Sequence, residues 1–301
     1  MPITKFPGGL KVATFRPPPR SFNPLKAREA DLIRYGFPRR PKEDKAAMER
    51  YEAMLERLKG KFHYIVPTFA RREDKQHRPL ERIAAGQETS SNWSGAVQYA
   101  STGNSFRWVE GDWTVPNVYA PTQNSWYYCS NWIGIDGDGS GDVCQAGVEC
   151  EVYQSGSSIS RNIYPWWEWY PDYEIPITNF KVSPGDEMTC VICTSGAGAT
   201  TASVFFTNAS SGAATSFSIT APGQTKLVGN SAEWIVERPY VNGQLAKLPD
   251  YGSVFFFNAE AHDGSQIRYA GQGNDMDMQD NGKIISDGIL DTDTVVQCLY
   301  K

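Results

Sequence analysis

The sequence has 301 residues, of which 40% are hydrophobic, and this content supports a sizeable buried core and excludes a disordered chain. Its formal net charge of −5 conceals an asymmetry, because residues 1–88 hold 20 Lys and Arg against 11 Asp and Glu, whereas residues 89–301 hold 9 against 23. The resulting balances of +9 and −14 predict that the two parts attract each other. The sequence has no stretch of about 18 apolar residues, which excludes a membrane-spanning helix.

The first part of the chain, residues 1–88, is rich in Pro, Arg and Lys and lacks the alternating aromatic runs of the remainder. We interpret it as a separate unit. Residues 42–59 predict one amphipathic helix, because apolar side chains recur there at helical intervals, namely at Met48, Tyr51, Leu55 and Leu58. Gly60 suits the C-terminal stop of that helix. One such helix cannot form a domain core by itself.

A basic segment can indicate nucleic-acid binding, but residues 1–88 contain no recognised RNA- or DNA-binding module, and the adjoining acidic part would repel phosphate. The favoured partner is therefore intramolecular, and the segment is predicted to be a propeptide. Lowering the pH toward ~4 neutralises carboxylates while Lys and Arg stay charged, so the attraction weakens. This predicts acid-triggered release of the segment.

The cysteines bear on the compartment in which the protein works. All six lie outside residues 1–88, and this even set predicts disulfide bonds, although a pairing such as Cys129 with Cys150 cannot be deduced from sequence. The first 15 residues lack the apolar stretch of a secretory signal peptide. We nevertheless expect a secreted protein with an unusual or truncated leader rather than an intracellular one.

From residue 91 onward, short runs of β-branched and aromatic residues alternate with Gly, Asn, Asp and Ser, and no convincing helix interrupts them. This pattern predicts an all-β fold, either an antiparallel β-sandwich or a barrel. The clearest strand-like runs are 106–115, 187–194, 202–207, 253–261 and 294–300.

Strand alternation places large aromatic rings and carboxylates on the same faces of the predicted strands. The residues that share a face in this way are Trp132 with Asp136, and Trp166 with Glu168 and Tyr170. In the run 232–237, Glu233 and Glu237 share a face with Ile235, opposite Trp234. Core strands seldom combine the two, because a buried carboxylate without a partner costs several kcal/mol or becomes protonated. A substrate cleft with aromatic walls and a few polar groups explains the combination.

Several familiar catalytic sites do not fit the sequence. His262 is the only histidine beyond residue 88, and its turn-like context disfavours a Ser-His-Asp or Cys-His site. The loop 136–142 superficially resembles a calcium loop, but Gly147 stands where an EF-hand has Glu, and flanking helices are not expected. We therefore predict a site without a metal or other cofactor.

Glu233 and Glu237 cannot share a proton as an aspartic-peptidase dyad does. Four residues of strand separate them by about 13 Å at ~3.3 Å per residue, whereas the dyad needs carboxyls about 3 Å apart. Gln145 is a plausible partner for one of them, since its amide can donate to a developing oxyanion, accept from a water and stay uncharged at acid pH. Taken alone, its Gln-Ala-Gly motif is weak.

Six motifs follow one another along the chain. They are Ser-Asn-Trp-Ser-Gly-Ala at 91–96, Trp-Thr-Val-Pro at 113–116, Trp-Ile-Gly-Ile-Asp-Gly at 132–137, Gln-Ala-Gly at 145–147, Trp-Glu-Trp-Tyr-Pro-Asp at 167–172 and Ala-Glu-Trp-Ile-Val-Glu at 232–237. In this order they resemble the glutamic peptidases, also called eqolisins or peptidase family G1. The resemblance runs from about residue 88 to the C-terminus, and the basic segment before it looks like the family's propeptide, without close motifs of its own.

The resemblance implies a concanavalin-like double-sheet β-sandwich whose concave face binds polypeptide. It also implies that Gln145 and Glu237 are the catalytic pair. The positions that it implies for the substrate cleft are Trp132, Asp136, Trp166, Glu168 and Tyr170, to which strand alternation adds Glu233. The chain departs from the family's pattern at Cys144, where an apolar residue is common, and at Arg238, where an acid is frequent. Cys144 should point away from the face of Gln145.

We therefore predict that residues 89–301 form a monomeric, acid-acting endopeptidase that cleaves internal peptide bonds by direct attack of water. Residues 1–88 would make it a zymogen that cleaves itself somewhere between 78 and 88. The alternative is a carbohydrate-binding sandwich or a glycosidase, because Trp-rich β-sandwiches stack sugars and a pair of Glu residues can cleave glycosides. A third possibility is an inactive structural sandwich with a basic tail.

Overall fold

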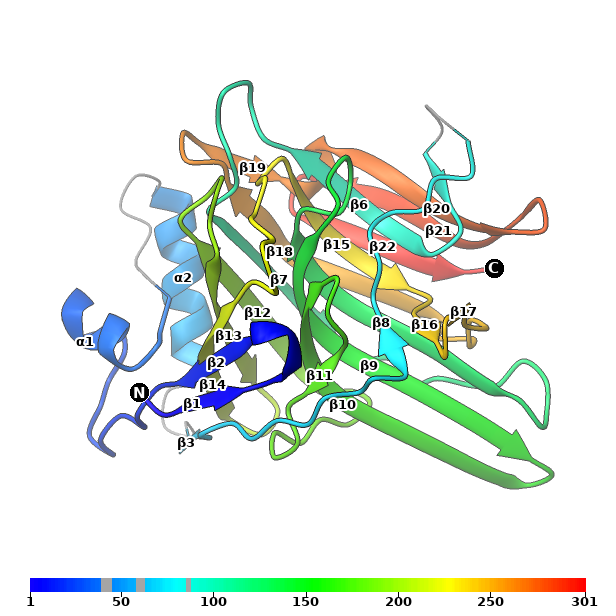
Figure 1. Cartoon of the computed structure of the whole chain (residues 1–301), viewed down its shortest axis with the longest axis horizontal. Helices are drawn as coiled ribbons and strands as arrows, with labels where there is room; N and C mark the ends of the chain where they lie inside the picture. Colours follow the sequence, from blue (N-terminus) through cyan, green and yellow to red (C-terminus); the bar gives the residue numbers. More distant parts are fainter. Residues whose placement is uncertain (39–44, 58–62, 85–87) are drawn as a thin grey trace.

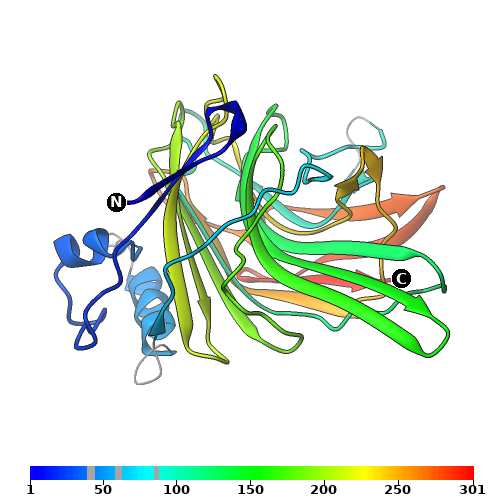
Figure 2. The same cartoon turned by 60° about the horizontal axis from the view of Figure 1, so that its bottom comes forward.

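Two antiparallel sheets pack face to face in the structure, a computed structural model that describes residues 1–38, 45–57, 63–84 and 88–301. Figures 1 and 2 show the two layers and the long hairpin of β9 (Val143–Ser155) and β10 (Ser158–Tyr170), which extends beyond the rest of the sandwich. The prediction of an all-β antiparallel sandwich is confirmed. Its strand-like runs match observed strands, and one of them, 187–194, has the bounds of β12.

The first layer, which we call the back sheet, is the larger one. Two-residue strands β3 (His63–Tyr64) and β5 (Thr89–Ser90) add to it in parallel, and β19 (Ile267–Tyr269) pairs with its strand β18 (Ser253–His262). From edge to edge its strands are β1 (Ile3–Lys5), β2 (Lys11–Thr14), β14 (Ala213–Thr220), β13 (Thr201–Asn208), β12 (Glu187–Thr194), β7 (Trp108–Thr114), β18 (Ser253–His262), β22 (Val295–Tyr300), β21 (Lys283–Thr292) and β20 (Asn274–Asp280).

The second layer, which we call the cleft sheet, carries the predicted site. It shares β20 with the back sheet, because β20 pairs with both β21 and β6 (Trp93–Tyr99). After β20 its strands are β6 (Trp93–Tyr99), β15 (Ser231–Glu237), β8 (Trp126–Ile135), β9, β10 and β11 (Ile175–Pro176). A small third sheet joins β17 (Gln244–Leu245), β16 (Tyr240–Val241) and β4 (Lys75–Gln76). The described residues also form two short 3-10 turns, η1 (Pro7–Gly9) and η2 (Ala270–Gln272).

The hydrophobic core lies between the two sheets and follows the strand alternation read from the sequence. In β15, Trp234 and Val236 belong to this core, whereas Ile235 belongs to a separate apolar cluster on the other face. Trp132 and Trp166 lie in that second cluster. The cleft sheet therefore buries one face against the back sheet and uses the other face for the site.

The N-terminal segment does not build a core of its own. Helices α1 (Glu29–Arg34) and α2 (Lys45–Arg57) lie beside the back sheet (Figure 1), and Tyr51 and Leu55 of α2 cluster with Val191 of β12 and Phe205 of β13. Each fully buried apolar side chain of this kind contributes roughly 1.5–3 kcal/mol. Helix α2 lies inside the predicted range 42–59, of which 42–44 and 58–59 are outside the described residues. No helix among the described residues is long and apolar enough to cross a membrane.

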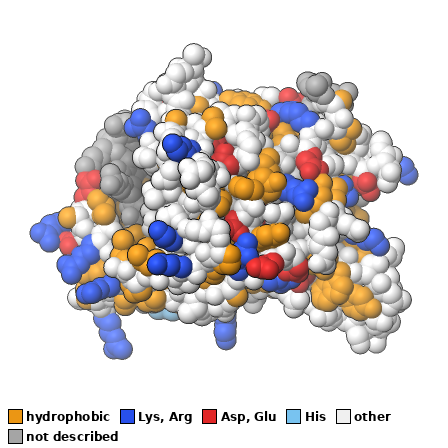
Figure 3. All heavy atoms as spheres, in the orientation of Figure 1, with side chains coloured by type: hydrophobic (Ala, Val, Ile, Leu, Met, Phe, Trp, Pro, Cys, Tyr) orange, Lys and Arg blue, Asp and Glu red, His pale blue; other side chains and the backbone are white. Residues whose placement is uncertain are grey.

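After β3 the segment leaves the back sheet and crosses to the cleft sheet. Phe69 bridges Ile177, and the amide of Arg72 donates to the carbonyl of Glu174 at 2.8 Å. In the space-filling view of Figure 3, Lys and Arg side chains project from the left edge, over the N-terminal helices. The basic segment thus covers the back sheet with its helices and reaches the opposite face of the sandwich with its extended part, which we call the strap, residues 65–82.

No disulfide joins the six cysteines, contrary to the prediction from their even number. Cys129 and Cys150 do face each other on β8 and β9, but both are free thiols. All except Cys193 are buried, and a buried thiol packs as a small apolar side chain. Burial raises the pKa of the Cys144 and Cys190 thiols, which keeps them in their unreactive protonated form.

Candidate active site

Gln145 and Glu237 come from two strands of the cleft sheet that are separated by β8. Gln145 lies near the start of β9, opposite Gly134 of β8 and Glu168 of β10, and Glu237 is the last residue of β15. Both side chains are fully buried. The neighbours of Gln145, Cys144 and Ala146, lie in the core between the sheets, so Cys144 points away from Gln145 as predicted.

Two glycines make room for Trp132 and for the backbone around it between these strands. A Cβ at Gly147 would lie 2.5 Å from Cβ of Trp132, and one at Gly134 would lie 2.8 Å from its ring. With this space, the indole N–H of Trp132 donates to Oε2 of Glu237 at 2.8 Å. The glycine of the Trp-Ile-Gly motif leaves room for the Trp132 ring, and that of the Gln-Ala-Gly motif lets the backbone of Asn131 and Trp132 approach closely.

The strap places one peptide group between the two predicted catalytic side chains. Nε2 of Gln145 donates to the carbonyl oxygen of His77 at 2.8 Å. The next backbone amide, that of Arg78, donates to Oε1 of Glu237 at 3.2 Å. The amide of His77 itself donates to both carboxyl oxygens of Glu168, at 3.1 and 3.0 Å. Gln145, Glu237 and Glu168 thus all bind backbone groups of the same two residues.

The side chain of His77 fills the centre of the cleft. Its ring stacks on Trp166 with 3.7 Å between centroids and an angle of 8° between planes. One ring nitrogen, Nδ1, lies 3.0 Å from Oε2 of Glu237, and the other, Nε2, lies 3.0 Å from Oε2 of Glu174. The imidazole therefore links the predicted catalytic carboxyl to a second buried carboxyl.

Two residues upstream, Lys75 occupies an acidic pocket of the cleft. Its buried ammonium group donates to Glu149 at 2.9 Å, to Glu151 at 2.6 Å and to the hydroxyl of Tyr164 at 2.9 Å. Burial would lower the pKa of Lys75, but Glu149, Glu174 and Glu151 outweigh it and raise that pKa. A buried cation compensated by several carboxylates is costly to uncouple.

The carboxyls around Lys75 respond to burial in different ways. Burial raises the pKa of Glu149 to about 7, although Lys75 opposes the shift. Burial also favours the neutral form of Glu151, but there the charge and hydrogen bond of Lys75 prevail and hold the pKa below its usual value. Acidification therefore neutralises Glu149 well before Glu151.

Burial is also the main influence on the carboxyls that touch the His77 backbone. It raises the pKa of Glu237, while His77, Trp132 and the amide of Arg78 partly offset the shift by stabilising the carboxylate. It raises the pKa of Glu168 well above its usual range. Both groups therefore bind protons more readily than exposed glutamates do.

The other predicted cleft residues have different surroundings. Asp136 accepts hydrogen bonds from the backbone amides of Val228, Gly229 and Asn230, at 2.7, 2.7 and 3.0 Å, and burial raises its pKa to about 7. Glu233 is fully buried, and burial raises the pKa of its carboxyl well above the usual range although Ser231 partly offsets the shift. Tyr170 packs against the apolar cluster that contains Trp132 and Trp166. The structure thus brings Trp132, Trp166 and Glu168 to the Gln145–Glu237 pair, and it surrounds Asp136 with a backbone loop.

Sequence reasoning missed the acidic pocket and its occupant. Glu149 and Glu151 alternate with Cys150 along β9, so strand alternation applied to residues 143–155 would have placed both on the face of Gln145. Lys75 and His77 carried no comparable signal, because Lys75 is one of 20 Lys and Arg in a basic segment and His77 stands in no recognisable catalytic motif there. Their role depends on a contact between distant parts of the chain.

His77, Glu149 and Glu174 place ligand atoms within 4.8 Å of one another, which is close enough to hold a metal ion. However, the Lys75 ammonium lies 2.9 Å from Glu149 and 3.9 Å from Glu174. These carboxylates therefore already have a cationic partner from the strap, and the cluster is explained without a metal.

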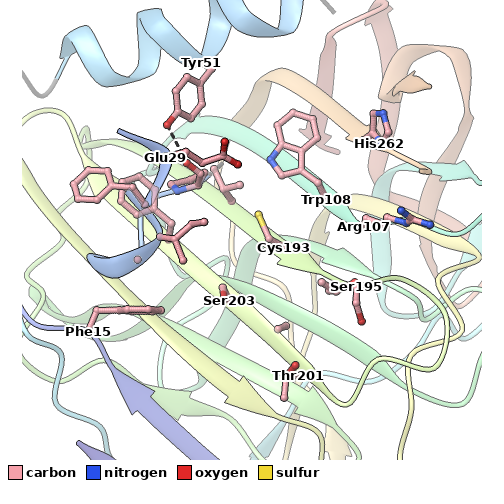
Figure 4. A pocket seen from close by; sticks show the side chains of 18 of the residues that line it. Phe15, Glu29, Tyr51, Arg107, Trp108, Cys193, Ser195, Thr201, Ser203 and His262 are labelled. Carbon is pink, nitrogen blue, oxygen red and sulfur yellow. Dashed lines mark hydrogen bonds between the residues drawn. The ribbon is translucent and has the colours of Figure 1, made fainter. Parts of the chain in front are cut away.

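A cavity of about 720 Å³ lies at a different place, between the N-terminal helices and the back sheet. Figure 4 shows Tyr51 of α2 above it, with Trp108 and Cys193 of the back sheet among its walls. None of the residues that line it belongs to the Gln145–Glu237 site. The predicted cleft itself is filled by the strap.

The fold and the site describe a double-sheet β-sandwich with a polypeptide segment bound in its concave face. A family model described as the Peptidase A4 family matches residues 91–300. Aspergillopepsin-2 of Aspergillus niger is 30% identical over 257 residues, which cover 79% of this chain and 87% of that protein.

Solved structures show the same fold. Scytalido-glutamic peptidase with a peptide-based transition state analog matches with a TM-score of 0.59 at 22% identity, over 70% of this chain and 98% of that chain. Aspergilloglutamic peptidase from Aspergillus niger matches with a TM-score of 0.52 at 27% identity, over 58% of this chain and 99% of that chain.

The chain belongs to the Peptidase A4 family. It is therefore a peptidase, a hydrolase whose substrates are polypeptides. The resemblance to the glutamic peptidases that was inferred from six short motifs is confirmed. This assignment decides against the alternatives of a carbohydrate-binding sandwich, a glycosidase and an inactive structural protein.

Proposed function

We propose that the protein is an acid-acting endopeptidase in which Gln145 and Glu237 catalyse direct attack of water on an internal peptide bond. One observation carries the proposal. The amide of Gln145 donates to the carbonyl of His77, and the carboxyl of Glu237 accepts from the amide of Arg78, so the two side chains bind the two ends of a single peptide group. A substrate bound in the same way would meet both groups at its scissile bond.

The proposed chemistry needs only groups that this site supplies. Donation from Gln145 polarises the carbonyl and stabilises the oxyanion that forms when water adds to it. Glu237 takes a proton from the attacking water and returns one to the leaving nitrogen, next to which its Oε1 lies. Because Glu237 is buried and its pKa is raised, it can serve as both base and acid at acid pH.

The side-chain oxygen of Gln145, Oε1, supports a role for this residue in holding the attacking water. Oε1 of Gln145 is buried and has no hydrogen-bond partner among the described residues. A buried acceptor without a partner is unfavourable by about 1–3 kcal/mol. Accepting a hydrogen bond from the attacking water would satisfy this oxygen at the moment when Nε2 binds the carbonyl.

The N-terminal segment is proposed to be a propeptide that keeps the enzyme inactive by filling the cleft. Its ion pairs support release at low pH. Glu149, with a pKa of about 7, loses its charge first, and Glu151, with a lowered pKa, follows only at lower pH, whereas Lys75 keeps its charge throughout. The attraction that holds Lys75 therefore weakens in two steps as the pH falls.

The active enzyme is proposed to be a secreted monomer. An enzyme whose cleft is freed only as the Lys75 ion pairs weaken at low pH would be poorly active near neutral pH, which fits an acidic extracellular medium better than the cytoplasm. Both predicted catalytic side chains and the cleft around them come from one chain.

The test is cleavage of denatured casein at about pH 3.5 by purified variants. Gln145→Ala should lower kcat by roughly 10²–10³, as loss of an oxyanion donor does. Glu237→Gln should lower it by roughly 10²–10⁴, as loss of a general acid–base does. Gln154→Ala and Glu187→Gln, which change exposed or partly exposed residues of the same types, are the matched controls. Full activity of either catalytic-pair variant would refute the assignment.

A further inference from the structure

We propose that the His77–Arg78 peptide bond is the bond that the protein cleaves in itself, so that Arg78 becomes the N-terminus of the processed enzyme. The proposal rests on the proposed function of Gln145 and Glu237. It goes beyond that function because it assigns the enzyme's first substrate to a single bond of its own chain.

The strap presents this bond to the pair as a substrate would. Gln145 contacts the His77 carbonyl at 2.8 Å, which is the oxygen that becomes the oxyanion. Glu237 contacts the Arg78 nitrogen at 3.2 Å, which is the atom that leaves. An inhibitory segment that merely blocked the cleft would not need to align one peptide group with both side chains.

Upstream contacts fix the register of the strap. β4 pairs with β16, with Gln76 opposite Tyr240. The Lys75 ammonium is held in its acidic pocket, and the His77 amide is held by both oxygens of Glu168. A shift by one residue would break all of these contacts together.

Downstream contacts hold the other side of the bond. The Arg78 guanidinium lies 3.8 Å from the ring centroid of Tyr240. The side-chain amide of Asn92 donates to the carbonyls of Arg78 and Pro79, at 3.3 and 3.2 Å, and the amide of Leu80 donates to a backbone carbonyl of the loop after β8 at 2.9 Å. Contacts on both the N-terminal and the C-terminal side therefore hold the His77–Arg78 bond in place.

The neighbouring peptide bonds are bound differently. The nitrogen of the Gln76–His77 bond donates to Glu168 and not to Glu237. The Arg78–Pro79 bond has a proline nitrogen, which carries no hydrogen, and its carbonyl is bound by Asn92 and not by Gln145. Among these three consecutive bonds, His77–Arg78 alone meets both members of the pair.

The reaction needs only water as a co-reactant. A C–O bond forms between the water oxygen and the carbonyl carbon of His77, and the C–N bond to Arg78 breaks. Glu237 accepts one proton of the water and passes it to the departing nitrogen. The products are a new carboxyl group at His77 and a new α-amino group at Arg78.

The experiment follows the full-length chain by mass spectrometry after transfer from about pH 7.5 to about pH 3.5, with Gln145→Ala as the uncleaved reference. The first products should be residues 1–77 and 78–301, with masses that assign the bond. Because the bond is already in the site, the first-order rate should not change over a 100-fold range of protein concentration. A casein assay on the same samples reports the peptidase activity independently.

Two variants sharpen the test. Arg78→Pro removes the amide hydrogen that contacts Glu237 and should abolish the cut between residues 77 and 78. Glu73→Ala, an exposed change in the same strap, should leave the cut in place. If Arg78→Pro does not fold, the terminus formed by the unmodified chain still decides the question.

The outcomes separate the two proposals. A chain that digests casein but first cuts itself at another bond, or stays intact, overturns the assignment of His77–Arg78 and leaves the catalytic pair standing. A first cut at His77–Arg78 whose rate rises in proportion to protein concentration also overturns it, because the bond would then be cut by other molecules. A chain that cleaves neither casein nor itself at any pH overturns both.

Discussion

The surroundings of one carboxyl, Glu237, determine how the proposed enzyme responds to pH. Its Oε2 lies 2.8 Å from the indole nitrogen of Trp132 and 3.0 Å from Nδ1 of His77, and its Oε1 accepts from Arg78. Cleavage between His77 and Arg78 would release His77 with residues 1–77 and would turn the Arg78 amide into an α-amino group, so neither contact would persist in its present form. In the processed enzyme, Trp132 would remain as the donor from the sandwich that stabilises the carboxylate.

Replacing that donor should move the pH profile. Trp132→Phe removes a hydrogen bond that favours the ionised form of Glu237, so the pKa of Glu237 should rise by about 1–2 units, because hydrogen bonds to charged groups contribute about 1.5–3 kcal/mol. The limb of the kcat/KM profile that reports Glu237 should move to higher pH by the same amount. The pH dependence of kcat/KM, recorded with the processed enzyme and a peptide substrate, measures this shift.

Trp93→Phe provides the matched comparison. Trp93 packs edge-on against Trp132 with 4.9 Å between ring centroids, but its indole nitrogen has no hydrogen-bond partner among the described residues. It should therefore change packing without moving the Glu237 limb. Equal shifts in both variants would mean that Trp132 acts through packing alone.

At the scale of elements, the strands that position the pair were predictable because their pattern is local. Alternation in residues 232–237 assigned Glu237 and Trp234 to opposite faces, and the structure has them there. The strap was not predictable in this way. β4 has two residues, its partner β16 begins 164 positions later, and its stability comes from side-chain contacts that leave no period in the sequence.

The separate N-terminal unit expected from composition also illustrates this limit. Charge and proline content marked residues 1–88 as different from the remainder, but they do not reveal which surface the segment contacts. The apolar side of α2 is completed by Val191 and Phe205, which belong to strands more than 100 residues away. The sequence shows that this helix needs a partner, and only the fold identifies it.

The stability of the strap in the cleft should depend on Lys75. Lys75→Met removes the cation from a pocket that contains Glu149, Glu151 and Glu174, and loss of one partner of a buried ion pair typically costs about 3–5 kcal/mol. The strap should then leave the cleft more readily. We expect the full-length variant to begin cleaving casein at a higher pH than the unmodified chain, as measured by the pH at which peptide release starts.

Lys45→Met, at a 92% exposed position of α2, removes the same charge from the same segment without touching the cleft. Its onset pH should match that of the unmodified chain. If both substitutions raised the onset equally, the total charge of the segment, and not the acidic pocket, would control release.

At the scale of the whole molecule, buried carboxyls make the fold better suited to acid than to neutral pH. Burial, assisted by Asp142, raises the pKa of Asp136 to about 7, and burial raises the pKa of Glu233 well above its usual range. The folded protein therefore holds protons that the unfolded chain releases above about pH 4. This contribution is present at low pH and is lost as the pH rises through the folded pKa values.

Other carboxyls set the acid limit of this stability. Burial would raise the pKa of Asp263, but hydrogen bonds from Ser101 and Ser265 hold it below its usual value. The stability that this group contributes is present above its unfolded pKa and is lost as the pH falls below about 4. The two sets together place the greatest stability at about pH 4, because Asp263 loses its contribution below that pH and the buried acids begin to lose theirs above it.

We therefore expect the free energy of unfolding to fall between pH 5 and pH 8, by an amount on the order of 1.4 kcal/mol for each unit of pKa shift that the buried acids retain. Urea unfolding of Gln145→Ala, followed by tryptophan fluorescence, measures this without self-digestion. Adding Asp136→Asn, which keeps a neutral side chain at that position, should reduce the loss between the two pH values. Unfolding free energies that were equal at pH 5 and pH 8, or higher at pH 8, would mean that these carboxyls are ionised inside the fold, and the raised pKa of Glu237 would lose its main physical support.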